Sequence, residues 1–295
     1  MKIKTTEIIQ PGYAMRTWVF AVALFALIIL IYYPTLQAGF ILDGHYVIEA
    51  NPNIKSVSRL PDVFLEDMFS AYKYQQVKHL TYYRPMVKIS FMLDYFFWNV
   101  QASGYRITNI LLHYANSLLV YLLIAHLFRD RRLGILTAFL FAILPVHEWV
   151  VGYAVGRGDL LQTLFSLLTI YTLVKGLEMR KLRLYTISVG FYICGLLSRE
   201  VTVLLPVLLM SFIAFYEKSL RRGIMLSIPY WFMGGLYILT RSLVFPIFDK
   251  SYTDFFTFRS IFDAAQLSFD YCYRFFIPWN LLSELPVAFQ TPNIV

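Results

Sequence analysis

Long apolar runs separated by short charged segments dominate the chain. A helix needs roughly 20 apolar residues to cross about 30 Å of hydrocarbon, and seven runs approach that length. The pattern predicts an all-α polytopic membrane protein with about seven transmembrane helices. The runs occupy residues 18–35, 107–128, 133–151, 160–174, 184–197, 201–216 and 223–244.

Three other stretches predict further helices, of which residues 84–98 are too short to cross a membrane. Residues 84–98 start at Arg84 and Pro85 and then run almost wholly apolar, and residues 260–282 are rich in aromatic side chains. Segments of this kind lie in the membrane interface, so we expect interfacial helices in the first outer loop and in the C-terminal outer segment. Residues 59–71 predict a further helix, because a proline lies near its start and acids follow in its first turns.

The composition supports a membrane protein and excludes several other classes. Charged residues make up 15% of the chain, hydrophobic residues make up 58%, and the mean hydropathy is +0.59. Globular domains carry about a quarter charged residues. The two cysteines, Cys194 and Cys272, are too few for a disulfide framework or a zinc site. A soluble domain, a disordered chain and a disulfide scaffold are therefore excluded.

The net charge of +8 is distributed unevenly. The N-terminal tail and three short loops hold 13 Lys and Arg against 4 acids, whereas the rest holds 13 against 14. Because Lys and Arg mark cytoplasmic loops, we predict a cytoplasmic tail over residues 1–17 and a transmembrane domain over 18–244. An outer loop over 36–106 belongs to that domain, and residues 245–295 form an extracytoplasmic or interfacial segment. The excess positive charge suits contact with anionic membrane lipids and does not indicate nucleic-acid binding.

Polar residues gather at the helix ends that this topology places outside. Charges at membrane depth are costly and mark function or a tight ion pair. We expect a cavity in which an arginine grips a phosphate and a carboxylate takes the proton of an attacking hydroxyl. A transporter would instead have such polar residues near the middle of the membrane, whereas these lie at helix ends. The residues are Asp43, His45, His147, Glu148, Arg157, Asp159, Arg199, Glu200 and Arg241.

Each cluster also has a structural interpretation that the sequence leaves open. Asp43 and Gly44 form a favourable turn, the segment 156–159 can cap a helix and pair internally, and residues 199–200 can be the tip of a hairpin. A further polar stripe on one helix face favours interhelical hydrogen bonds over catalysis. It consists of Asn109, His113 and Asn116.

Taken in order, six short motifs resemble those of the GT-C glycosyltransferases. The similarity is greatest to the membrane portion of the transmembrane O-mannosyltransferases that carry tetratricopeptide repeats, and to their bacterial relatives. It extends from about residue 15 to residue 286. The motifs are Phe40-Ile-Leu-Asp43-Gly-His45, Tyr83-Arg84-Pro85, Gly104-Tyr-Arg-Ile-Thr-Asn109, Leu144-Pro145-Val-His147-Glu148, Gly156-Arg157-Gly-Asp159 and Ser198-Arg199-Glu200.

The resemblance implies an enzyme that moves mannose or another hexose from a polyprenyl-phosphate donor to a protein hydroxyl or a lipid-linked glycan. The reaction would take place on the extracytoplasmic face of a bacterial inner membrane or of the endoplasmic reticulum. In that family an acidic pair in the first outer loop carries catalysis, and its first acid matches Asp43. The resemblance implies that the donor phosphate is held by Arg84, Arg157 and Arg199, and that the sugar and acceptor pocket is shaped by His45, His147, Glu148, Asp159 and Glu200.

Two departures from the family pattern keep a second interpretation open. Gly44 stands where the family has its second acid. A divalent cation is the only cofactor that the resemblance suggests, and the loss of this carboxylate weakens the case for it. The chain ends at Val295, whereas family members usually continue with further spans, and other membrane subunits could supply these. The alternative is therefore a catalytically degenerate scaffold subunit of a larger membrane complex.

Overall fold

The structure is a computed structural model that describes residues 11–69 and 82–244, all within one compact unit that ends at Phe245. Every regular element in these two ranges is helical, as predicted. Short 3-10 and π-helical turns, labelled η, connect the longer helices. The α-helices are α1 (Pro11–Tyr32), α2 (Pro85–Trp98), α3 (Ala102–Phe128), α4 (Arg131–Ile143), α5 (Glu148–Gly152), α6 (Arg157–Met179), α7 (Leu182–Leu196), α8 (Leu205–Tyr216) and α9 (Leu220–Val244).

All seven apolar runs are helical, but only some of them have the length to cross a membrane. Within the described residues there are four candidate spans, or five if α4 and α5, which meet at a bend of 51°, form one span. The helices at Leu182–Leu196 and Glu200–Tyr216 are apolar but shorter. A 15-residue helix is about 22 Å long, which is less than the hydrocarbon thickness. The four long spans are Thr17–Gln37, Ala102–Phe128, Ala154–Met179 and Leu220–Leu243.

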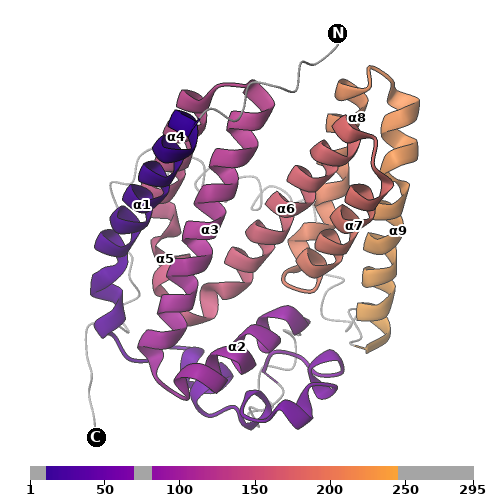
Figure 1. The fold of residues 1–295 in the computed structure, drawn as a ribbon. Coiled ribbons are helices and arrows are strands. Elements are labelled where there is room, and N and C mark those ends of the chain that lie inside the picture. Colours follow the sequence, from indigo (N-terminus) through magenta and orange to yellow (C-terminus); the bar gives the residue numbers. More distant parts are fainter. Residues whose placement is uncertain (1–10, 70–81, 245–295) are drawn as a thin grey trace, which may run out of the picture. The chain divides into compact units, whose positions relative to one another are not determined.

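Three pairs of antiparallel helices, joined by tight turns, make up the bundle (Figure 1). The pairs are α3 with α4, α6 with α7 and α8 with α9, and α3 also packs against α6. Each turn contains a basic residue with positive φ, namely Arg129, Arg180 or Lys218. A left-handed residue ends a helix, and a cation there faces the negative end of the helix dipole. The residues that predict cytoplasmic loops therefore also form the turns.

Helix α2 lies across one end of the bundle, against α3 and α6 (Figure 1). One face of α2 buries Phe91 and Met92, whereas Leu93, Phe96 and Phe97 on its outer side are 58%, 75% and 69% exposed. This confirms a helix at the predicted position, and its place in a membrane interface remains a prediction. The predicted C-terminal interfacial helix lies outside the described residues.

The helix predicted over residues 59–71 is not present in the described part of that stretch. Two 3-10 turns, Val57–Arg59 and Asp62–Phe64, replace it. The segment is held by contacts that a straight helix would not make. Val63 is buried in the core, and the Nζ atom of Lys88 on α2 lies 3.6 Å from Glu66 Oε2.

Candidate functional site

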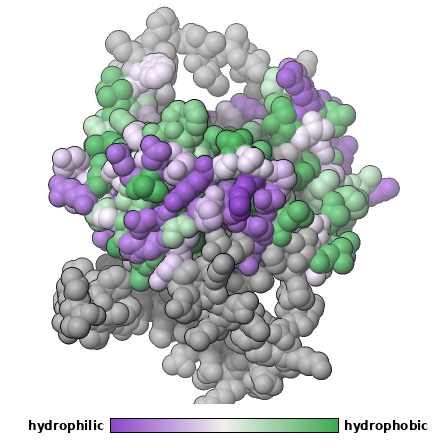
Figure 2. All heavy atoms as spheres, turned by 90° about the horizontal axis from the view of Figure 1, so that it is seen from below, coloured by the Kyte–Doolittle hydropathy of each residue, from purple (hydrophilic) through white to green (hydrophobic). Residues whose placement is uncertain are grey.

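The end of the bundle at which α2 lies carries hydrophilic residues across its middle, with hydrophobic residues at the sides (Figure 2). Most of the residues that the sequence singles out lie in this region. Their contacts place them in separate groups, which we describe in turn.

The first group joins the start of α2 to the turn between α7 and η8 (Glu200–Leu204). The guanidinium of Arg84 donates two hydrogen bonds to Glu200, from Nη2 to Oε1 at 3.0 Å and from Nε to Oε2 at 3.3 Å. The backbone N–H of Met86 donates to the carbonyl of Leu197 at 3.1 Å. This bidentate pair fixes the plane of the arginine fork, which is the geometry that also binds phosphate.

Arg199 and Asp159 extend this group. Arg199 Nη1 forms an ion pair with Asp159 Oδ2, and the two side chains are 30% and 39% exposed. Burial and then the charge of Arg84 lower the pKa of Arg199, so the two guanidinium groups are close. Arg241 on α9 interacts electrostatically with Glu200. We call these five residues, Arg84, Asp159, Arg199, Glu200 and Arg241, the arginine cluster.

An apolar groove lies beside the arginine cluster, between α7 and α9. Its cavity volume is about 140 Å³. Tyr83 in its wall directly precedes Arg84 in the chain, and Tyr237 is within electrostatic range of Arg241 and Arg84. The groove therefore runs up to the cluster. It is lined by Tyr83, Ile193, Leu196, Leu197, Met233, Leu236, Tyr237 and Thr240.

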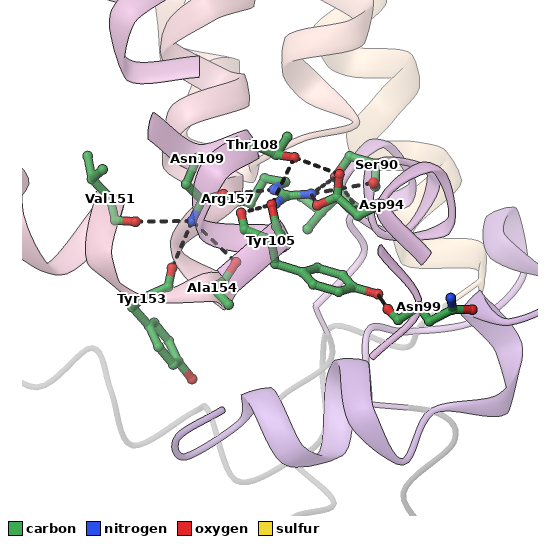
Figure 3. A network of polar contacts seen from close by, with 12 residues as sticks. Ser90, Asp94, Asn99, Tyr105, Thr108, Asn109, Val151, Tyr153, Ala154 and Arg157 are labelled. Atoms are coloured by element: carbon green, nitrogen blue, oxygen red, sulfur yellow. Dashed lines mark hydrogen bonds and ion pairs between the residues drawn. The ribbon is translucent and has the colours of Figure 1, made fainter. Parts of the chain in front are cut away.

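Arg157 is fully buried and belongs to a different network (Figure 3). Its Nε donates to Asn109 Oδ1 at 2.9 Å, its Nη2 donates to the Tyr105 carbonyl at 2.7 Å, and its Nη1 pairs with Asp94 Oδ2. A phosphate could reach this guanidinium only if Asp94 moved away. Arg157 thus takes part in hydrogen bonds and an ion pair inside the helical bundle. Its ion-pair partner is Asp94 rather than the neighbouring Asp159.

Asp94 is the residue that the sequence analysis missed. It is buried on α2 and also accepts a hydrogen bond from the Thr108 hydroxyl at 2.8 Å. Burial raises the pKa of Asp94, while the charge of Arg157 and this hydrogen bond act in the opposite direction. The available signal was the single acid of a largely apolar helix, since such a residue needs a partner.

The polar stripe on α3 makes interhelical contacts, as its structural interpretation predicts. The amide of Asn109 donates to the Tyr153 carbonyl at 3.0 Å, and that of Asn116 donates to the Leu160 carbonyl at 3.0 Å. His113 Nε2 lies 3.2 Å from the Ala142 carbonyl oxygen. The carbonyls of Tyr153 and Ala142 lie at a helix break and a helix end, whereas that of Leu160 lies within the first turns of α6.

Asp43 lies in the turn that follows η1 (Tyr33–Gln37), and its side chain is exposed. Its backbone N–H donates to the Tyr153 hydroxyl at 3.1 Å. Leu42, directly before it, has a φ of 47°, a conformation that costs a non-glycine residue roughly 1–3 kcal/mol. A Cβ at Gly44 would lie 3.3 Å from Phe40 Cδ1, so a larger residue at position 44 would press on that ring.

The remaining predicted residues are His45, His147 and Glu148. His45 Nδ1 lies 2.6 Å from Glu49 Oε2, one helical turn along, and both side chains are exposed. The ring of His147 packs 4.5 Å from that of Phe141 and 5.1 Å from that of His113, measured between centroids. Glu148 is exposed at the start of α5. Over residues 11–69 and 82–244, no three His, Cys, Asp or Glu side chains gather as a metal site.

Comparisons with known proteins place this geometry in context. A model of the family described as dolichyl-phosphate-mannose-protein mannosyltransferase matches residues 86–245, more than half of the chain. Protein O-mannosyl-transferase TMTC3 of Mus musculus is 30% identical over 147 residues, which are 49% of this chain and 16% of that protein. Protein O-mannosyl-transferase tmtc2 of Xenopus laevis is 31% identical over 186 residues, which are 61% and 22%.

Protein O-mannosyl-transferase Tmtc1 of Drosophila melanogaster is 28% identical over 179 residues, which are 60% of this chain and 21% of that protein. The chain thus spans about a fifth of the length of the curated relatives it matches. No solved structure matches significantly.

Proposed function

Because the chain belongs to the dolichyl-phosphate-mannose-protein mannosyltransferase family, we propose that it transfers a sugar from a polyprenyl-phosphate donor to a protein hydroxyl. Its apolar helices and its family make it an integral membrane protein. The donor, the acceptor and the extracytoplasmic location of the reaction are parts of this proposal.

The arginine cluster beside an apolar groove is the observation that carries the proposal. A polyprenyl phosphate presents a diffuse anion attached to a long apolar chain. Guanidinium groups suit the phosphate, because their fork matches its oxygens, and an apolar groove suits the chain. A phosphate bound there would take over contacts that Asp159 and Glu200 now make with Arg199 and Arg84.

In the proposed reaction, the acceptor hydroxyl gives its proton to the exposed carboxylate of Asp43, which acts as general base. The hydroxyl oxygen forms a bond to the anomeric carbon of the sugar, and the bond from that carbon to the phosphate oxygen breaks. Polyprenyl phosphate leaves with the electron pair, and Arg84 and Arg199 stabilise its negative charge. His45, His147 and Glu148 are proposed to line the sugar and acceptor pocket.

The membrane arrangement is also proposed. We infer that the N-terminus is cytoplasmic and that the shorter helices α7 and η8–α8 complete seven crossings. The turns at Arg129, Arg180 and Lys218 support this topology, because all three contain basic residues and lie at the opposite ends of their helices from α2 (Figure 1). The exposed side chains of Leu93 and Phe96 support a position for α2 in the membrane interface.

Binding of a polyprenyl phosphate to the purified full chain in lipid nanodiscs tests the donor site. Arg199→Gln removes a charge-assisted contact, so we expect the Kd to rise roughly 10-fold or more. Arg221→Gln, a change to an exposed arginine at the start of α9, is the matched control and is expected to leave the Kd unchanged. Equal affinities of the two variants would contradict the site.

A scaffold subunit is the second candidate, and Gly44 is the observation that favours it. The crowding of position 44 by Phe40 fits a loop that has adapted to the loss of an acid. In this case the pairs Arg84–Glu200 and Arg199–Asp159 would serve only to hold helices together. Purification in mild detergent would then bring down stoichiometric partner subunits, and the complex would consume no sugar-phosphate lipid.

A further inference from the structure

The side chain of Tyr153 reaches from the turn after α5 to the loop that carries Asp43. Its hydroxyl oxygen accepts the Asp43 backbone N–H at 3.1 Å, a contact between segments 110 residues apart in the sequence. Only 9% of Tyr153 is exposed. The ring also packs on that of Trp149, with 5.1 Å between centroids. Tyr153 thus connects the loop that carries Asp43 to the helical bundle.

The backbone of Tyr153 is fixed by the buried network. Its carbonyl accepts one hydrogen bond from the Asn109 amide at 3.0 Å and another from the Gly156 N–H at 2.9 Å. Asn109 is in turn held by Arg157, which pairs with Asp94. Figure 3 shows the carbonyl of Tyr153 directed into this network and its ring extending away from it. These hydrogen bonds therefore fix the backbone from which the Tyr153 ring extends.

Arg106 holds the segment that leads into the loop of Asp43. This residue is buried on α3, and its guanidinium donates to the carbonyls of Ala38, Gly39 and Gly152. The last of these carbonyls directly precedes Tyr153. Arg106 and Tyr153 together hold the strained turn at Leu42, whose φ is 47°. Strained backbone persists where the surrounding contacts determine it, and it is concentrated at functional sites.

We propose that Tyr153 is a positioning residue for Asp43, with its hydroxyl fixing the place of the carboxylate relative to the acceptor. This inference rests on the proposed function, in which Asp43 is the general base. The hydroxyl has two roles that a phenylalanine cannot fill. It accepts the Asp43 N–H, and it is able to donate its own proton to the Asp43 carboxylate.

The electrostatics agree with this arrangement. Burial and, after it, the charge of Asp43 raise the pKa of Tyr153. The phenol therefore keeps its proton over the physiological range and remains a hydrogen-bond donor. Asp43 is free to approach the acceptor on its exposed side.

Steady-state kinetics of sugar transfer by the full chain in membranes test the proposal. For Tyr153→Phe we expect kcat to fall roughly 10- to 100-fold, because a misplaced catalytic group costs that much, while KM for the donor and the acceptor stays within about twofold. The control is Tyr114→Phe, which also loses a hydroxyl bonded to another segment, here to the Ala21 carbonyl at 3.2 Å.

The outcomes separate this inference from the proposed function. If Asp43→Asn is inactive and Tyr153→Phe has the kcat of Tyr114→Phe, the positioning role is overturned while the base assignment stands. A parallel loss of melting temperature in Tyr153→Phe would also overturn it, because the hydroxyl would then stabilise the fold rather than position Asp43. If Asp43→Asn is as active as the parent, the base assignment itself is wrong.

Discussion

The buried guanidinium of Arg157 shows how the bundle holds a charge out of water. Moving an ion into a protein interior costs several kcal/mol, and this cost is offset only where a counter-ion and further hydrogen bonds are present. Asp94, Asn109 and the Tyr105 carbonyl supply them. The ring of Phe91 adds a cation–π contact, with its centroid 4.9 Å from the guanidinium carbon.

Removal of Arg157 should therefore act on stability before it acts on donor binding. Arg157→Met leaves Asp94 buried without its counter-ion, for which we expect a loss of about 3–5 kcal/mol and a clear fall in melting temperature in detergent. The double variant Arg157→Met with Asp94→Leu should recover part of the loss. A stable Arg157→Met protein that no longer binds polyprenyl phosphate would instead support the donor-binding role implied by the sequence resemblance.

The sequence allowed only part of this site to be predicted. Asn109, His113 and Asn116 could be assigned to interhelical hydrogen bonds, because their spacing on one helix is visible in the chain. The partners of Arg157 and of Asp43 could not, since Asp94 and Tyr153 are distant in sequence and come close only when α2 and the α5 turn pack against the bundle. The pairing of Arg199 with Asp159 was hidden in the same way.

Close helix contacts in the bundle depend on small residues. A Cβ at Gly223 on α9 would lie 2.7 Å from Ala214 Cβ on α8, whereas a Cβ at Gly235 on the same helix would meet nothing within 4 Å. Small residues let helix backbones approach closely in membranes, where van der Waals packing drives association. Gly223 is therefore required by packing, and Gly235 is not.

A leucine at each of these positions should have opposite consequences. We expect Gly223→Leu to destabilise the fold by roughly 1–3 kcal/mol through overpacking, measured as a lower melting temperature of the purified protein. Gly235→Leu should be neutral or slightly stabilising, because glycine is a poor helix former. Similar melting temperatures for both variants would show that α8 and α9 do not pack as described.

The existence of the helices was predictable, but their lengths were not. The apolar runs mark every long helix, because burial and lipid contact both demand apolar residues. The run over 133–151 looks continuous, yet Pro145 begins a 3-10 turn there and α4 and α5 meet at 51°. Residues 59–71 have a favourable helix start, but tertiary contacts of Val63 and Glu66 override it.

The chain as a whole is a helical membrane protein of the GT-C type, as its motifs indicate. The family match and the roughly 30% identity to O-mannosyl-transferases confirm that resemblance. Its basic turns, all at one end of the bundle, combine two functions. They close antiparallel helix pairs, and they carry the positive charge on which the proposed orientation rests.

Single cysteines and a membrane-impermeant maleimide test this topology in a chain whose Cys194 and Cys272 are replaced by serine. We expect Ser58→Cys and Val201→Cys to react from the extracytoplasmic side, and Lys181→Cys to react only after the membrane is permeabilised. All three positions are exposed. If Val201→Cys reacts from the same side as Lys181→Cys, α7 does not cross the membrane and the seven-span arrangement is wrong.

Transfer of radiolabelled mannose from a polyprenyl phosphate to a protein acceptor, measured in membranes that contain equal amounts of folded parent and Asp43→Asn chains, decides whether this protein is an enzyme. We expect transfer by the parent and a loss of at least about 100-fold in Asp43→Asn, the usual effect of removing a general base. Equal transfer by both chains would contradict the role of Asp43. The absence of transfer by the parent, together with stoichiometric partner subunits, would favour the scaffold.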